Sequence, residues 1–238
     1  MMNEIQLAEI RNYLLTKKLP IDILIEVQDH FVSQILDLQR EENLSFEEAF
    51  EQTKLNWKKE LHLYWDGSID LMDNSKFKKK MEQQIWFSIL KKATLYLGLS
   101  LLMLLFLANI FNVKFFGYFI TSLMILATIF PAAYYFYNIK KFGLIKKYDN
   151  YVLTLYQVPA ATFLSVLGVA VVYIPRTFEK ANLFHEFFRL KMGWENIGVA
   201  FAFLFIIFSG ILIFMSQREY LYRMEKVKPF LKYLKPNS

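Results

Sequence analysis

The chain has 238 residues, of which 55% are hydrophobic and 18% aromatic, and this apolar share is higher than an ordinary soluble protein carries. Its formal net charge of +6 combines two unequal parts: residues 1–75 hold 15 acidic and 7 basic residues, whereas the remainder holds 7 acidic and 21 basic residues. The chain has no cysteine, which excludes disulfides, thiolate metal sites and a cysteine nucleophile.

The first part, residues 1–75, is predicted to be an acidic cytosolic domain of three helices. Residues 3–18 carry apolar side chains at near-helical spacing, and Pro20 stands where a first-turn proline can open a second helix. Ser45 followed by Glu48 forms a capping box, which predicts the start of a third helix. The N-terminal residues lack the basic and apolar regions of a signal peptide, so we expect this domain to stay inside the cell.

The second part, residues 76–238, is predicted to be a membrane domain. Its apolar stretches are close in length to the roughly 20 residues that a helix needs to cross a hydrocarbon core. Four of them occur, at about residues 93–111, 115–137, 151–174 and 197–215. Peptide groups that face lipid must be hydrogen-bonded within the protein, so these stretches are predicted to be helices. The predicted fold class is therefore all-α, with a small cytosolic three-helix domain followed by a four-helix transmembrane bundle.

The basic residues beside these stretches predict the orientation of the chain. Residues 76–92, the loop at 140–147 and the tail at 216–238 together hold 16 Lys and Arg residues, and the segments on the other side hold 5. Cytoplasmic loops of membrane proteins are enriched in Lys and Arg. We therefore expect both termini to lie in the cytoplasm.

The basic tail, residues 216–238, interleaves bases with aromatic residues, as is typical of a segment on a membrane surface. Each base near an anionic leaflet contributes about 1 kcal/mol, so anionic lipids at the cytosolic face explain the tail without nucleic acid. A further hypothesis is that the acidic N-terminal domain competes with lipid for these bases, which gives a docked and a released state. The candidate contacts in the tail are Arg218, Arg223, Lys226 and Lys228.

Two other groups of residues are candidate contact sites. Glu26, Asp29 and His30 fall within about one helical turn, a spacing that can place a carboxylate and an imidazole on one metal. No second ligand cluster accompanies them, so we favour a solvated surface group that contacts a protein partner. Between residues 175 and 195 the pattern predicts an amphipathic helix in the outer interface, with Phe184 and Phe188 on its apolar face. It is either a lid or partner-docking element, or a helix that rests on the bilayer.

The residues favour a binding protein over an enzyme. No nucleophile with an adjacent base, carboxylate dyad or phosphate-binding glycine loop is found, so we predict no catalytic residue and no cofactor. The leading interpretation is a membrane protein of regulatory or scaffolding type, whose cytosolic domain binds a protein partner; a homo-oligomer is compatible with the sequence. The alternative is a small transporter or channel-like protein with a site between the second and third stretches, which Pro131 and Pro159 interrupt beside Gln157.

The first third of the chain also resembles a known family. The residues that carry the resemblance are the string IRNYLLTKKLP at 10–20, Glu26 with the Asp-His-Phe at 29–31, and SFEEAF at 45–50. They resemble the HAAS-type domain, which precedes membrane helices in many bacterial proteins. The resemblance implies a cytosolic three-helix module on a small multi-pass protein of the bacterial inner membrane, in a family often linked with regulatory systems. It assigns no catalytic residue.

Overall fold

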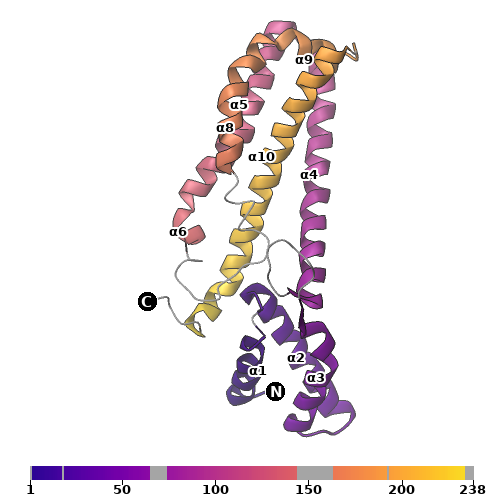
Figure 1. Cartoon of the computed structure of the whole chain (residues 1–238), viewed down its shortest axis with the longest axis vertical. Helices are drawn as coiled ribbons and strands as arrows, with labels where there is room; N and C mark the ends of the chain where they lie inside the picture. The colour runs from indigo at the N-terminus through magenta and orange to yellow at the C-terminus, as the bar shows by residue number, and fades with distance from the viewer. Residues whose placement is uncertain (1, 18, 65–73, 144–162, 192, 234–238) are drawn as a thin grey trace. The chain divides into compact units, whose positions relative to one another are not determined.

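The structure is almost entirely helical (Figure 1). It is a computed structural model that describes residues 2–17, 19–64, 74–143, 163–191 and 193–233. These residues divide into two compact units. The first unit holds the described residues up to Ile85 together with 223–233, and the second holds 86–143 and 163–222. For the described residues, the predicted all-α fold class is confirmed.

The first unit begins with the three expected helices, α1 (Glu4–Leu15), α2 (Ile21–Glu41) and α3 (Phe46–Leu61). Pro20 is the N-cap of α2 and not its first helical residue. All three helices contribute to one apolar core, which includes the buried side chains of Ile10, Leu14, Val27, Phe31, Ile35 and Phe50. A two-residue antiparallel pair of strands, β1 (Leu63–Tyr64) and β2 (Asn74–Ser75), comes before the next helix.

Helix α3 starts at the predicted capping box. The Ser45 hydroxyl accepts the Glu48 backbone N–H at 3.3 Å, and the Ser45 N–H donates to Glu48 Oε2 at 2.9 Å. The serine hydroxyl also donates to the same carboxylate at 2.8 Å. The hydrogen bonds from the Ser45 backbone and hydroxyl hold the pKa of the Glu48 carboxyl below its ordinary value. The box satisfies backbone donors that a helix N-terminus otherwise leaves unpaired.

The second unit is a bundle of long helices. Its members are α5 (Val113–Tyr137), the short α6 (Ile139–Phe142), α8 (Phe163–Glu179), α9 (Ala181–Phe188), and most of α4 (Lys76–Ile110) and α10 (Trp194–Val227). Within this unit, α4, α5, α8 and α10 run alongside one another, and α9 lies at the end where α8 leads into α10 (Figure 1). A 3-10 helix, η2 (Lys228–Tyr233), follows α10 and belongs to the first unit.

Three helices in the described part of the chain are long and apolar enough to cross a membrane, namely α4, α5 and α10 with its extension to Leu231. Large apolar side chains on their outer faces remain exposed: Leu102 and Phe106 of α4 each keep 65% of their surface accessible. Such surface is unfavourable in water and favourable in hydrocarbon. The three helices therefore have the character of membrane spans.

Several observed helices extend beyond the predicted spans; α4, for example, begins at Lys76, ahead of the span predicted at 93–111. The predicted third span covered residues 151–174; residues 151–162 lie outside the described part, and the described remainder, α8, continues past Pro175 to Glu179. The predicted fourth span ended at residue 215, but α10 continues to Val227. The predicted surface tail therefore begins as helix, with Tyr220, Met224 and Val227 buried. Apolar residues at steps of three and four carry the helix beyond the point where charges appear.

Helices α5 and α10 approach closely where α10 carries a glycine. A Cβ added to Gly210 would overlap the backbone carbonyl of Ala127 on α5. Phe214, one turn further along α10, packs edge-on against Phe130 and Tyr134, with ring centroids 4.9 and 5.2 Å away. Small residues let helix backbones meet in lipid, where apolar side chains gain little by leaving the hydrocarbon.

We predict that Gly210→Ala destabilises the bundle by about 1–3 kcal/mol, because the added methyl group forces the two helices apart. Gly98→Ala on α4 is the matched control, because a Cβ there meets no atom within 4 Å. The measurement is thermal unfolding of the full chain in detergent. Equal unfolding temperatures for the two variants would contradict the close contact at Gly210.

We predict that Ser45→Ala weakens the first turn of α3 by about 1 kcal/mol, seen as about fivefold faster hydrogen exchange of its amides in the full chain. Ser33→Ala, at an exposed position inside α2, should leave that exchange unchanged.

The capping box should also make the first turn of α3 sensitive to pH. Because folding lowers the pKa of Glu48, the stability that its carboxylate contributes is complete above the pKa of the unfolded state and is lost as pH falls through the pKa of the folded state. The protection of these α3 amides against hydrogen exchange should therefore decline below about pH 4, and Glu48→Gln should remove this dependence on pH.

Candidate functional site

Helix α9 closes one end of the bundle with aromatic side chains. Phe184 and Phe188 are 2% and 1% exposed. The Phe184 ring lies edge-on to Phe203 of α10 at 5.2 Å, and the Phe188 ring lies 5.9 Å from Phe116 of α5. Their spacing of four residues places both rings on one face of α9. That face therefore forms part of the core of the second unit.

This burial differs from the expectation for the loop between residues 175 and 195. Phe184 and Phe188 were expected to face the outer interface of a bilayer, or to serve as a lid or docking surface. In the structure, α5 and α10 cover them. The sequence pattern correctly showed an apolar face on a short helix, but such a face packs on protein as readily as on lipid. The spacing of apolar residues does not indicate whether protein or lipid covers the apolar face.

His185 fixes α9 to the connection between α4 and α5. Its Nε2 lies 2.9 Å from the backbone oxygen of Phe111, and its ring stands edge-on to Phe116 at 5.5 Å. A carbonyl oxygen only accepts hydrogen bonds, so Nε2 is the protonated nitrogen. The bond also satisfies a carbonyl at the end of α4 that has no partner within the helix.

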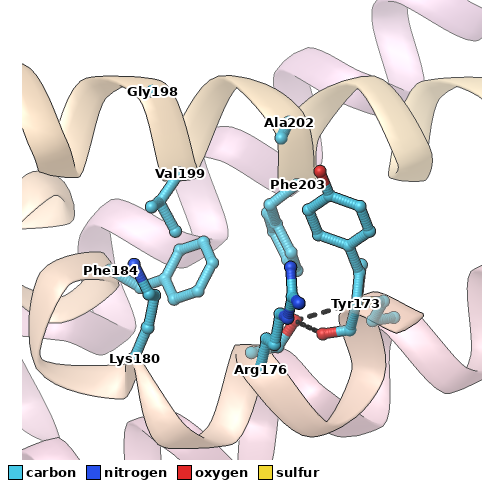
Figure 2. Close-up of a pocket in the computed structure, with 10 residues that line it drawn as sticks. Tyr173, Arg176, Lys180, Phe184, Gly198, Val199, Ala202 and Phe203 are labelled. Atoms are coloured by element: carbon cyan, nitrogen blue, oxygen red, sulfur yellow. Dashed lines mark hydrogen bonds between the residues drawn. The ribbon is translucent and has the colours of Figure 1, made fainter. Parts of the chain in front are cut away.

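A pocket of about 240 Å³ opens beside α9, between the end of α8 and the first turns of α10 (Figure 2). Its inner wall is apolar and buried, and consists of Met124, Phe184 and Phe203, with the hydroxyl of Thr177 bonded to Tyr173 O at 2.8 Å. The remaining lining residues are Tyr173, Arg176, Lys180, Gly198, Val199 and Ala202. The pocket thus combines an apolar inner wall with a basic rim.

The two bases on the rim are in different situations. Lys180 pairs with Glu195 at 3.3 Å, and their side chains are 44% and 69% exposed. The Arg176 side chain makes no hydrogen bond or ion pair with any residue that the structure describes, and Figure 2 shows its guanidinium reaching into the space beside Tyr173 and Phe203. A guanidinium offers five donors in a planar fork that matches phosphate and carboxylate. The rim can therefore hold an anion.

The acidic candidates in the first unit lie on one stripe of α2. Asp29 and His30 are exposed, and Glu26 is half-buried. The His30 ring lies 6.0 Å from that of Trp57 on α3, whose Nε1 donates to Gln34 at 2.9 Å. Within the described residues, no group of three or more His, Asp or Glu side chains is placed to hold a metal. The three residues form a mixed acidic and aromatic surface.

The four basic candidates in the tail are not equivalent. Arg218, Lys226 and Lys228 are exposed, and Lys228 lies 4.0 Å from Glu225. Arg223 lies in the first unit, where its Nη1 is 3.4 Å from Oδ2 of Asp22, at the start of α2. The Asp22 side chain is 3% exposed and that of Arg223 is 19% exposed. One tail base is thus already paired with the acidic helix.

Several polar residues that the structure singles out were not predicted from the sequence. Asp22, Arg176 and Lys180 were not among the candidate site residues. Ser216 and Gln217 are fully buried on α10, and their side-chain polar atoms have no partner among the described residues. The signal for this pair was present, because two polar residues directly follow an apolar span. Gln157, the polar residue of the predicted transport site, lies outside the described residues.

Comparisons of the chain with protein-family models, with curated proteins and with solved structures found no match.

We predict that Phe188→Ala destabilises the full chain by about 3–5 kcal/mol, because it leaves a cavity among Phe116 and its neighbours. Phe201→Ala on α10 should cost far less, since that ring is 73% exposed. Thermal unfolding in detergent measures both. If Phe188 lay on the surface, the two variants would be equally stable.

Proposed function

We propose that this chain is a multi-pass membrane protein of regulatory or scaffolding type, whose N-terminal helical unit binds a protein partner. In this proposal the apolar helices hold the chain in the bacterial inner membrane, with both termini in the cytoplasm. The N-terminal unit is a module of the HAAS type. The observation that carries the proposal is the acidic stripe of α2, where one of the acids is paired with a base from the far end of the chain.

The stripe has the spacing of a recognition surface. Asp22, Glu26 and Asp29 follow one another at steps of four and three, which aligns them along one side of the helix. Asp29 is exposed and Glu26 half-buried, so a basic segment of a partner can reach both. The neighbouring rings of His30 and Trp57 add apolar contact area, which interfaces need in addition to charge.

The pair between Asp22 and Arg223 supplies the regulation. Removing one member of a fully buried ion pair destabilises a protein by about 3–5 kcal/mol. The pair between Asp22 and Arg223 is partly exposed, so breaking it costs less. Attraction of a base to an anionic leaflet contributes about 1 kcal/mol. Because these free energies are comparable, a basic partner or anionic lipid can shift the pair between closed and open states. Opening it exposes the third acid of the stripe.

The transport alternative has less support. It required a polar site between the second and third predicted spans, and its key residue is not among those described. The pocket beside Arg176 is lined by the end of α8, the first turns of α10 and Met124 of α5, and it does not include the predicted polar site. Transport therefore stays an alternative prediction from the sequence.

The test is photo-crosslinking of the full chain in its native membranes. A crosslinking residue in place of His30 should capture one defined protein, and the same residue in place of Asn12, exposed on α1, should not. Glu26→Lys should abolish the product through charge repulsion. Arg223→Gln should increase it several-fold, because it removes the base paired with Asp22, and Arg218→Gln, which removes an exposed base five residues earlier in the chain, should not.

Two results would contradict the proposal. One is the same products from positions 12 and 30, which means that capture is not specific to the stripe. The other is an equal response to Arg223→Gln and Arg218→Gln, which means that pairing with Asp22 does not control access. Limited proteolysis of each variant confirms that the N-terminal unit is still folded.

A further inference from the structure

We propose that the pocket between the end of α8 and the start of α10 binds the headgroup of one anionic phospholipid. The Arg176 guanidinium holds the phosphate, and the apolar inner wall receives the part of the lipid next to it. This inference concerns the second unit alone and does not depend on the partner proposed for the first.

The charges around the pocket match a singly charged headgroup. Arg176 and Lys180 are four residues apart, so both lie on the side of the chain that faces α10 (Figure 2). Glu195 neutralises Lys180 at 3.3 Å, which leaves a formal surplus of one positive charge. A phospholipid whose only net charge is its phosphodiester carries one negative charge. A bidentate contact with Arg176 would satisfy donors that have no partner in the described residues.

The shape of the pocket sets the size of the ligand. Its volume of about 240 Å³ lies below the roughly 300 Å³ at which pockets for drug-sized molecules begin. It therefore accommodates a headgroup and the adjoining atoms, and not a whole lipid. The wall of Met124, Phe184 and Phe203 is buried and apolar, which suits the transition from headgroup to acyl chain.

The position along the helices is also that of a headgroup. Trp194, the first residue of α10, is 93% exposed, as expected for a side chain in the aromatic belt at a membrane interface. Gly198 on the rim lies four residues further, about 6 Å along the helix axis. The pocket thus opens within about one helical turn of the predicted interface. By the count of bases, this is the side with fewer Lys and Arg residues.

A purely structural role explains only part of the arrangement. Bases in the last turn of a helix interact favourably with its carbonyl groups, and Arg176 and Lys180 lie at the end of α8. Lys180 also holds Glu195 at the start of α10. Neither role requires a pocket with an apolar inner wall beside a guanidinium that has no partner in the described part of the chain. Lipid binding and the structural role therefore predict different outcomes for variants that leave the charges intact.

The experiment uses the full chain in neutral detergent and counts bound lipids by native mass spectrometry. The probe is phosphatidylglycerol, and one molecule should remain bound per chain. Arg176→Gln should lower its occupancy about tenfold, the size expected for one lost charge-assisted contact. Lys191→Gln removes an equal charge from an exposed residue outside the pocket and should change occupancy less than twofold.

A second variant fills the pocket without removing its basic residues. Gly198→Leu keeps both bases and should block the lipid, and a Cβ at Gly198 meets no atom within 4 Å, so the helix should tolerate it. Phosphatidylcholine, which has the same phosphate without net charge, should bind more weakly. Inorganic phosphate should not displace the bound lipid.

Three results would overturn the proposal. Equal losses for Arg176→Gln and Lys191→Gln would show non-specific electrostatic attraction. Unchanged binding in Gly198→Leu would place the lipid elsewhere on the protein. Displacement by inorganic phosphate would assign the site to a free anion. Unfolding temperatures measured on the same samples show whether each variant is folded, so a loss of binding cannot be mistaken for a loss of structure.

Discussion

The apolar outer surface of the long helices is the constraint on which the second unit depends. Leu102 and Phe106 keep most of their surface exposed, and only hydrocarbon makes that favourable. Once lipid covers these faces, the hydrophobic effect no longer drives the helices together, and contact between them has to come from close packing. The approach of Gly210 to Ala127 and the aromatic cluster of α9 supply that packing. The same constraint keeps acids and bases near the ends of the spans, where α8 meets α10 and where α10 enters the first unit.

The sequence predicted the elements that local patterns determine. The capping box at Ser45 gave the start of α3 to the residue, because Ser45 and Glu48 lie three residues apart and bond to each other's backbone N–H groups. The apolar stretches gave the positions of α4, α5 and α10, because hydrocarbon selects for length and composition. Helix α10 continues twelve residues past the predicted span, because the appearance of charges marks the edge of the membrane and not the end of a helix.

The candidate sites were harder to predict, because they join residues that are distant in sequence. Nothing near Asp22 indicates Arg223, which lies 201 residues away. Nothing near Arg176 indicates that Phe203 completes a pocket beside it. The pattern of Phe184 and Phe188 gave the correct face of α9 but not its neighbours. Composition and periodicity describe one element at a time, whereas a site depends on which elements meet.

The pair between Asp22 and Arg223 differs from an ordinary surface ion pair in the conformational entropy that its side chains lose when the pair forms. Exposed pairs contribute little, partly because two flexible side chains must be held in one geometry. Asp22 lies in the first turn of α2 with 3% of its side chain exposed, and α10 has no break before Arg223. Much of the freedom of both groups is thus already lost through helix formation and burial, so less remains to be lost when the pair forms. Arg218, by contrast, is exposed and keeps more of this freedom. A base of that kind suits loose attraction to a charged leaflet, whereas Arg223 suits a specific contact that a partner must displace.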